Sequence, residues 1–298
     1  MERQRAGVLD RVTTSTIEIK VLGTFEVARG DEALDVGGPK QRSVLALLAL
    51  HGSRGLTVEG LIDGVWGETA PDSARSSVYA YVSNLRSTLG EETIERRRGT
   101  YVLADSTSDA VAFEELLDAA EQQVGTEPEA AAAALRDSLD LWRGLPYADL
   151  PDVSGLREES RRLEELRVRA VEMLMEAELG AGRGGELVPE LRALVSDYPL
   201  RERFRAQLML ALYRAGRQAE ALRAFDEGRE LLVEELGVDP SPELRELQLK
   251  ILEQDEDLLA GSGQVTTQRL AFLFSDIESS VRLWDLHKQE MATVLAAH

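Results

Sequence analysis

Hydrophobic and polar positions alternate near the start of the chain and then change to helical spacing. Residues 17–22 (IEIKVL) place apolar side chains at every second position, and a period of two predicts a half-buried strand. Short runs around 25–27 and 34–36 predict two more strands, which together give a small antiparallel sheet. Pro39 follows two glycines and suits the first position of a helix, so the sheet is expected to end there.

Three helices are predicted after this sheet. The first is almost entirely apolar over 44–50, and the second begins at Thr57, a residue type that caps helix N-termini. The third runs from Ser73 to Leu89 and ends at Gly90. Its apolar residues recur at i, i+4, i+7 and i+11 and predict one face toward the core. They are Val78, Val82, Leu85 and Leu89.

The opposite face of this third helix is polar and carries no acid between Arg75 and Gly90. Its residues are Ser76, Ser77, Tyr79, Ser83, Asn84 and Arg86, with Tyr81 at the margin. Small polar groups, tyrosine and arginine suit the DNA major groove, which admits an α-helix and presents donors and acceptors on base edges. A polar helix face that is simply solvated is the alternative, and a single feature of this kind does not decide between them.

A hairpin with a basic tip is predicted over residues 93–103. Two β-prone runs flank Arg96, Arg97, Arg98 and Gly99. Such a hairpin can reach phosphates or a minor groove beside the helix. Three arginines at a turn are also common on ordinary protein surfaces. The hypothesis of DNA binding therefore depends on the ordered set of sheet, three helices and basic hairpin.

Residues 111–255 predict helices only. Helical segments are expected at 111–123, 128–143, 156–180, 185–196, 200–215, 218–236 and 241–255. Paired helices of this length indicate a stacked helical repeat. The clearest unit spans 207–228, where small residues and Phe225 are spaced like a tetratricopeptide repeat. The predicted fold class is therefore mainly α with a small β component.

Composition and charge limit the classes of protein. The chain has 298 residues, no cysteine and no apolar run of membrane-spanning length, so we expect a cytoplasmic protein without disulfides or thiolate metal sites. The net charge of −20 argues against DNA binding, but residues 1–105 hold 13 basic and 15 acidic residues, a balance of −2 that leaves −18 elsewhere. His51, His287 and His298 have no metal-ligand spacing, and no cofactor is expected.

Residues 17–105 resemble the OmpR/PhoB-type winged helix of SARP-type antibiotic regulatory proteins. The segments that carry the resemblance are VLGTFEV (21–27), GGPKQRSVLALLALH (37–51), LIDGVWGETAPDSARSSVYAYVSNLRSTLG (61–90) and RRRGTYVLA near 97–105. The resemblance implies a winged helix-turn-helix domain over 15–105, a recognition helix from Ser73 to Leu89 and a wing from Arg96 to Tyr101. Ser83 and Asn84 stand where relatives often have arginine.

The resemblance also implies a DNA-binding face. The residues expected on it from the recognition helix are Arg75, Ser77, Tyr81, Ser83, Asn84 and Arg86. The wing is expected to add Arg96, Arg97, Arg98 and Tyr101. Lys40 and Arg42 are expected to approach a phosphate from the first helix.

Residues 110–256 resemble the bacterial transcriptional activation domain of the same regulators, a tetratricopeptide-like helical domain. The segments are LDLWRGLPYADL (139–150), RRLEELRVRAVE (161–172), YPLRERFRAQLMLALYRAGRQAEALRAF (198–225) and ELGVDPSPELREL (235–247). The resemblance implies dimerisation, ligand sensing or contact with the transcription apparatus, and a passive spacer is the alternative. Trp142 and Tyr147 are interpreted as packing residues rather than a ligand box.

The remaining residues predict a linker over 257–268 and a new unit over 269–298. The motif FLFSDIESSVRLW (272–284) resembles the start of class III adenylate/guanylate cyclase domains. That resemblance implies Asp276 as a Mg²⁺ ligand in an intact domain. Because residues 269–298 would be only the beginning of such a domain, we expect no catalysis from this chain.

The sequence therefore favours a DNA-binding transcriptional regulator and not an enzyme. The resemblance implies an activator that binds promoter direct repeats on double-stranded DNA as a possible homodimer and contacts RNA polymerase holoenzyme, with no membrane association. About five to seven phosphate contacts are expected, so affinity should fall steeply with salt. The alternatives are the regulatory part of a nucleotide cyclase and a helical-repeat scaffold.

Overall fold

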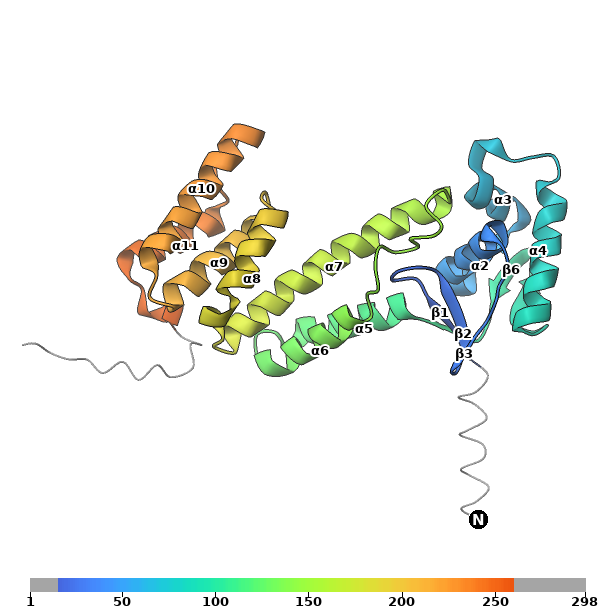
Figure 1. Ribbon diagram of the computed structural model, residues 1–298, viewed down its shortest axis with the longest axis horizontal. Coiled ribbons are helices and arrows are strands. Elements are labelled where there is room, and N and C mark those ends of the chain that lie inside the picture. The colour runs from blue at the N-terminus through green and yellow to red at the C-terminus, as the bar shows by residue number, and fades with distance from the viewer. Residues whose placement is uncertain (1–15, 260–298) are drawn as a thin grey trace, which may run out of the picture. The chain divides into compact units, whose positions relative to one another are not determined.

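The predicted N-terminal strands form a four-stranded sheet in the computed structural model, which describes residues 16–259 (Figure 1). The strand order is β3-β2-β1-β7, with bounds β1 (Ile17–Lys20), β2 (Glu26–Arg29), β3 (Glu32–Ala33) and β7 (Ser106–Ser108). β1, β2 and β3 pair antiparallel, as predicted, and β7, which was not predicted, pairs with β1 in parallel. The third strand lies two residues earlier than predicted, and Leu34 adds one further backbone bond to Val27.

The three predicted helices of the first domain are present. They are α2 (Pro39–His51), α3 (Val58–Trp66) and α4 (Ala74–Leu89), with short 3₁₀ turns η1 (Gly52–Arg54) and η2 (Gly67–Thr69) between them. The Thr57 hydroxyl accepts a hydrogen bond of 3.0 Å from the Gly60 amide and caps α3, as expected. The apolar stripe of α4 is fully buried against α2 and α3, which confirms the predicted core face.

A second sheet forms the hairpin after α4. Its order is β4-β6-β5, with bounds β4 (Leu56–Thr57), β5 (Ile94–Arg97) and β6 (Thr100–Leu103). Arg97 lies opposite Thr100, so the turn contains only Arg98 and Gly99, with φ of 50° and 91°. Positive φ at both positions is the backbone of a type I′ hairpin turn, which matches the twist of the two strands.

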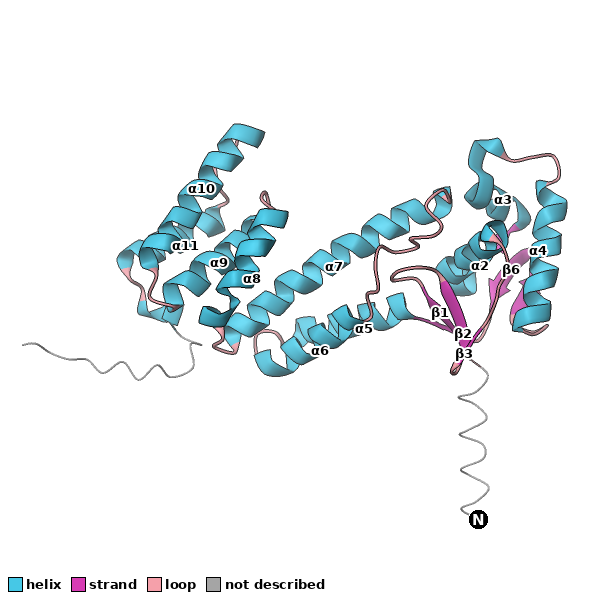
Figure 2. Ribbon diagram, in the orientation of Figure 1, coloured by secondary structure: helices cyan, strands magenta, loops and turns pink. Residues whose placement is uncertain are grey.

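Among the described residues, every strand precedes α5, and the rest is helical (Figure 2). The helices are α5 (Asp109–Gln123), α6 (Pro128–Asp140), α7 (Ser154–Gly180), α8 (Gly184–Asp197), α9 (Glu202–Arg214), α10 (Gln218–Leu236) and α11 (Pro242–Glu253), followed by the 3₁₀ turn η3 (Glu256–Leu259). Successive helices pack on one another, and Phe225 and the small Ala221 lie buried between α9 and α10. The predicted class is confirmed: a winged helix followed by a tetratricopeptide-like helical domain.

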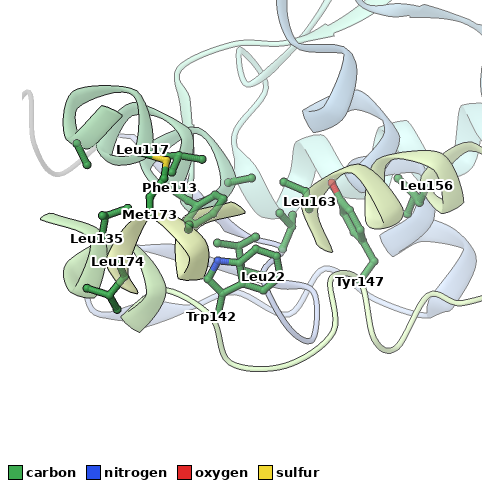
Figure 3. Packing of buried hydrophobic residues seen from close by; sticks show 14 of the residues in the cluster. Leu22, Phe113, Leu117, Leu135, Trp142, Tyr147, Leu156, Leu163, Met173 and Leu174 are labelled. Atoms are coloured by element: carbon green, nitrogen blue, oxygen red, sulfur yellow. The ribbon is translucent and has the colours of Figure 1, made fainter. Parts of the chain in front are cut away.

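The connection 141–153 between α6 and α7 joins the helical domain to the winged helix. Its backbone amides at Arg143 and Tyr147 donate to the carbonyl oxygens of Leu22 and Val21, at 2.7 and 3.0 Å. The Trp142 ring meets Phe113 edge-on, with centroids 5.3 Å apart (Figure 3). Trp142 and Tyr147 are both buried, so their interpretation as packing residues is confirmed.

Asp109 and Gly155 tighten the same junction. The Asp109 carboxylate accepts hydrogen bonds from the amides of Val21 and Leu22, at 2.7 and 3.2 Å. At the other end of the connection, Gly155 of α7 lies so close to Gly64 of α3 that an added Cβ would be 3.4 Å from the Gly64 Cα. These contacts make the described part of the chain one compact unit.

Within residues 16–259, no helix has the length and apolar character needed to span a bilayer.

Candidate nucleic-acid interface

The outward face of α4 is exposed and free of acidic residues. The helix sequence ARSSVYAYVSNLRSTL contains no aspartate or glutamate, and its buried residues are confined to one stripe. The exposed residues on the other side are Arg75, Ser76, Tyr79, Ala80, Ser83, Asn84 and Ser87. Hydroxyl, amide and aromatic groups on a convex helix surface are suited to base edges in a major groove.

The C-terminal end of α4 is fixed by polar contacts to the rest of the winged helix. The Leu89 carbonyl oxygen accepts hydrogen bonds from the Arg29 guanidinium at 2.5 Å and from the Thr93 hydroxyl at 2.7 Å. A cation at a helix C-terminus is favoured by the helix dipole. These contacts fix the position of α4 in the winged helix, while its outward face stays exposed.

Arg86 joins α4 to the base of the hairpin. Its Nε donates a hydrogen bond of 2.8 Å to the Ile94 carbonyl oxygen, and its guanidinium lies 5.7 Å from the centre of the Tyr101 ring. The side chain is half-buried, unlike the exposed serines of the same helix. Arg86 therefore positions the hairpin relative to α4, a role that the helical pattern does not reveal.

The three hairpin arginines differ in their partners. Arg97 pairs with Glu95 at 2.5 Å, and its guanidinium holds the pKa of Glu95 below its ordinary value. Arg96 lies 6.0 Å from the centre of the Tyr101 ring. Arg98 occupies the tip of the turn and has no carboxylate partner among the described residues. The positive charge most available to an anionic ligand is therefore at Arg98, with Arg96 beside it.

Arg75, at the start of α4, and Lys40, on α2, are engaged within the protein. Arg75 pairs with Glu59 at 2.5 Å, and a backbone hydrogen bond and the Arg75 guanidinium lower the pKa of Glu59. Lys40 donates to the Val65 carbonyl oxygen at 2.9 Å and lies 5.5 Å from the centre of the Trp66 ring. Arg75 remains exposed and can exchange its partner, whereas Lys40 is partly buried.

Three predicted residues are wholly or partly covered by the rest of the fold. Tyr101 is only 5% exposed because its ring fills the core under the hairpin, so its expected DNA contact is corrected. Tyr81 is half-buried, with its ring stacked on Trp66 at 6.5 Å. Arg42 pairs with Asp149 and donates to the Phe25 carbonyl oxygen, which directs it toward the connection 141–153 rather than toward α4.

The small polar residues predicted on the outward face of α4 are exposed or half-buried there. Ser83 and Asn84 are exposed, and the Asn84 amide is 3.3 Å from the Gln41 side-chain oxygen. Ser77 is half-buried and donates its hydroxyl to the Ser73 carbonyl oxygen at 3.0 Å. Tyr79, 42% exposed, is the aromatic residue of this face in place of Tyr81. Tyr79 is spaced four residues from the exposed Arg75 and Ser83, whereas Tyr81 is not. This helical spacing is the signal in the sequence that identifies Tyr79, rather than Tyr81, as the exposed tyrosine.

The predicted Mg²⁺ ligand Asp276 and the predicted cyclase start at 269–298 lie outside the described residues, as does most of the predicted linker. Within residues 16–259, no group of three or more His, Asp or Glu side chains is arranged to hold a metal ion.

Two known families match the chain. The family "Transcriptional regulatory protein, C terminal" matches residues 35–121, and "Bacterial transcriptional activator domain" matches residues 108–252. The first range contains α2 to α4 and the hairpin, and the second contains the helices from α5 onward.

Curated relatives with similar sequence carry the names of regulators. "Regulatory protein AfsR" of Streptomyces griseus is 41% identical over 249 residues, which cover 83% of this chain and 26% of that protein. "Regulatory protein DnrI" of Streptomyces peucetius is 35% identical over 253 residues, which cover 80% of this chain and 93% of that protein. The chain thus spans about a quarter of the length of the AfsR relatives and matches most of DnrI.

A solved structure shares the fold. The structure described as "Mycobacterium tuberculosis EmbR in complex with low affinity phosphopeptide" aligns with a TM-score of 0.76 and 31% identity. The alignment covers 83% of this chain and 69% of that chain. The families and relatives named here are described as transcriptional or regulatory proteins.

Proposed function

The chain belongs to the family of SARP-type transcriptional regulators, and from this premise we propose how it binds DNA and activates transcription. Members of this family join an OmpR-like winged helix to a bacterial transcriptional activator domain. Helix α4 enters the major groove of double-stranded DNA, and the hairpin of β5 and β6 contacts the backbone beside it. The sequence predicts domains over 15–105 and 110–256, and we propose that the first extends to Ser108, because β7 pairs with β1 of the winged-helix sheet and α5 begins at Asp109.

One observation carries this proposal. The outward face of α4 has no acidic residue and lies beside a hairpin whose tip holds Arg98, a cation with no carboxylate partner within residues 16–259. A carboxylate on that face would be repelled by phosphate, and the chain has 54 acidic residues in all, so a 16-residue helix without one is a specific feature. Docking of a helix in the major groove with a flanking backbone contact is the general geometry of this class of domain.

We assign the exposed residues two roles. Tyr79, Ser83 and Asn84 face base edges, where hydroxyl and amide groups discriminate between base pairs. The hairpin arginines and Arg75 contact phosphates and set the register of the helix without reading sequence. Lys40 already donates one hydrogen bond to the Val65 carbonyl oxygen and can add a phosphate contact only through its remaining N–H groups. We leave Arg42, Tyr81 and Tyr101 out of this interface.

Activation requires a second contact. We propose that two copies bind direct repeats near a promoter and that the helical domain contacts RNA polymerase holoenzyme. The acidic helical domain is suited to this because it does not spread along DNA, so the winged helix alone determines where the protein binds.

Selection of bound sites from random DNA, followed by fluorescence anisotropy on the selected sequence, tests the DNA-binding proposal. We expect affinity for the selected site to exceed affinity for random DNA by at least about 10³-fold at physiological salt. Equal affinity for the selected and the scrambled sequences would contradict a sequence-reading role for α4.

A second candidate function rests on the sequence FLFSDIESSVRLW (272–284) alone. If the full-length protein contains a class III cyclase domain, Asp276 would be among its Mg²⁺ ligands, and the domains described here would regulate it. Incubation of the full-length protein with ATP or GTP and Mg²⁺ tests this function. Formation of a cyclic nucleotide that is lost in Asp276→Ala supports it, and absence of product contradicts it.

A further inference from the structure

Two glutamates lie against arginines of the proposed DNA-binding face. Glu59, in the first turn of α3, pairs with Arg75 of the neighbouring helix α4 at 2.5 Å (Figure 1). Glu95 of β5 pairs with Arg97 on the same strand, also at 2.5 Å. Both arginines are assigned to phosphates in the proposed function, so in the free protein each already has an anionic partner.

These two pairs contribute little to the stability of the fold. The side chains of Glu59 and Arg75 are 65% and 55% exposed, and those of Glu95 and Arg97 are 38% and 59% exposed. Water and salt screen charges with this exposure, and such ion pairs add little or nothing measurable to the free energy of unfolding. Each pair can therefore be opened by a competing anion while the winged helix stays folded.

Arg75 has partners on both α3 and α4. Hydrogen bonds with Glu59 and with the Tyr79 side chain raise the pKa of Arg75. In turn, a backbone hydrogen bond, the Arg75 guanidinium and the Thr57 side chain lower the pKa of Glu59. The Glu59 carboxylate is therefore charged near neutral pH, where it occupies the same guanidinium that a phosphate would bind.

The opening of such a pair changes the ion balance of DNA binding. An arginine that neutralises a phosphate releases a condensed cation, and this release makes affinity fall with salt. When the arginine leaves a carboxylate to do so, the carboxylate is left without its partner and attracts a cation from solution. Release and uptake offset each other, so a paired arginine adds little to affinity or to its salt dependence.

We propose that Glu59 and Glu95 are internal competitors of the DNA backbone. Their carboxylates occupy Arg75 and Arg97 as phosphates would, and they limit affinity for DNA of every sequence. The inference rests on the proposed function, because it requires α4 and the hairpin to face DNA.

This competition has a consequence for the search for binding sites. Binding to random DNA comes almost entirely from phosphate contacts, whereas base contacts add affinity only at the correct site. Arg96 and Arg98, which have no carboxylate partner within residues 16–259, keep their phosphate contacts. A reduced phosphate contribution shortens the time spent on random DNA and leaves the acid-free face of α4 to discriminate between sequences.

Salt titrations of the whole chain on DNA, followed by fluorescence anisotropy, test the proposal. Glu59→Gln/Glu95→Gln should raise affinity at least about tenfold at about 0.1 M salt, on a selected site and on a scrambled sequence alike. The plot of log K against log salt should become steeper by about 1.8, because two phosphate contacts of ~0.9 each are no longer offset. Each single variant should give about half of this change in slope.

A double-variant comparison separates competition for the arginine from simple repulsion of phosphate. Arg75→Ala should change affinity by less than about twofold in the wild-type protein and should lower it about fivefold in Glu59→Gln. Glu59→Asp keeps the charge and should stay within about twofold of wild type. A gain from Glu59→Gln that persists in full after Arg75→Ala would show repulsion alone and contradict the proposal.

The matched control is Glu121→Gln. Glu121 of α5 pairs with Arg169 of α7, and the two side chains are 51% and 47% exposed, so this change removes the same charge from the same kind of pair. It should leave both affinity and salt slope unchanged. An equal gain in Glu121→Gln would assign the effect to net charge and overturn the proposal.

Two further outcomes separate this inference from the proposed function. Urea midpoints of all variants should stay close to that of wild type, because the pairs are exposed. Sequence-selective binding by the wild type with an unchanged slope in Glu59→Gln/Glu95→Gln would contradict the competition alone. Absence of any DNA binding by the wild type would overturn the proposed function, and this inference with it.

Discussion

The Arg86 guanidinium of α4 donates a hydrogen bond of 2.8 Å to the Ile94 carbonyl oxygen at the start of β5. The same side chain covers the face of Tyr101 on the neighbouring strand. One residue thus connects the helix that we propose enters the major groove to both strands of the hairpin beside it. The relative position of helix and hairpin, and so the proposed simultaneous contact of both with DNA, depends on this link.

Replacement of Arg86 by alanine should weaken the fold as well as DNA binding. Loss of the hydrogen bond and of the contact with Tyr101 should reduce the free energy of unfolding by about 1–3 kcal/mol. Affinity should fall by a similar factor on every sequence, because the hairpin is displaced rather than a base contact removed. Urea denaturation and anisotropy on matched and mismatched sites measure the two effects. A loss confined to one base position would instead place Arg86 against that base.

The hairpin arginines should supply salt-dependent affinity without specificity. Arg96→Ala/Arg97→Ala/Arg98→Ala should flatten the plot of log K against log salt by about 1–3, since each phosphate contact contributes ~0.9 to the slope. Arg98→Ala alone should account for the largest single part, because Arg97 is already paired with Glu95. Arg223→Ala, on the helical domain, is the control. An unchanged slope in the triple variant would remove the hairpin from the interface.

Asn84 should read a base. Its amide can bond an adenine edge in two places, so Asn84→Ala should reduce discrimination at one base pair by about 1–3 kcal/mol and leave other positions unchanged. Gln41→Ala is the matched control, because it removes the Asn84 partner and keeps Asn84 itself. Anisotropy titrations on a set of singly substituted sites give the comparison. Equal losses at all positions would assign Asn84 a backbone contact.

The seam between α3 and α7 should not accept a larger side chain. A Cβ on Gly155 would lie 2.7 Å from Leu47 and 3.4 Å from Gly64, so Gly155→Leu should lower the free energy of unfolding by about 1–3 kcal/mol through overpacking. Gly185, on α8, has nothing within 4 Å of an added Cβ, and Gly185→Leu should leave stability equal or slightly higher. Denaturant midpoints compare the pair. Similar stability of both variants would show that the seam is open in solution.

Burial of Tyr147 should make stability depend on alkaline pH. Burial, together with the nearby charges of Glu159 and Asp109, raises the pKa of Tyr147 well above its ordinary value of 10.0. The unfolded chain therefore loses this proton first, so stability is fully present below pH 10 and falls as pH rises above it. Tyr147→Phe should flatten the loss between pH 9 and 11 in urea denaturation. An identical pH profile for both proteins would rule out a contribution from this phenol.

The amino-acid sequence by itself determined the order of the helices and the faces with which they pack. Thr57 caps its helix and Phe225 fills its helix seam as predicted, because capping and helical periodicity depend on residues a few positions apart. β7 was not predicted, because its partner β1 is almost ninety residues away and local spacing carries no information on such a pairing.

Tertiary structure alone decided which predicted contact residues remain available. Arg42 is an ordinary exposed cation in the sequence, and only the fold brings Asp149 of the connection 141–153 to it. Tyr101 alternates correctly for a hairpin, yet the turn at Arg98 and Gly99 directs its ring into the core. The availability of a charge or ring depends on partners distant in sequence, because burial and ion pairing are properties of the folded surface.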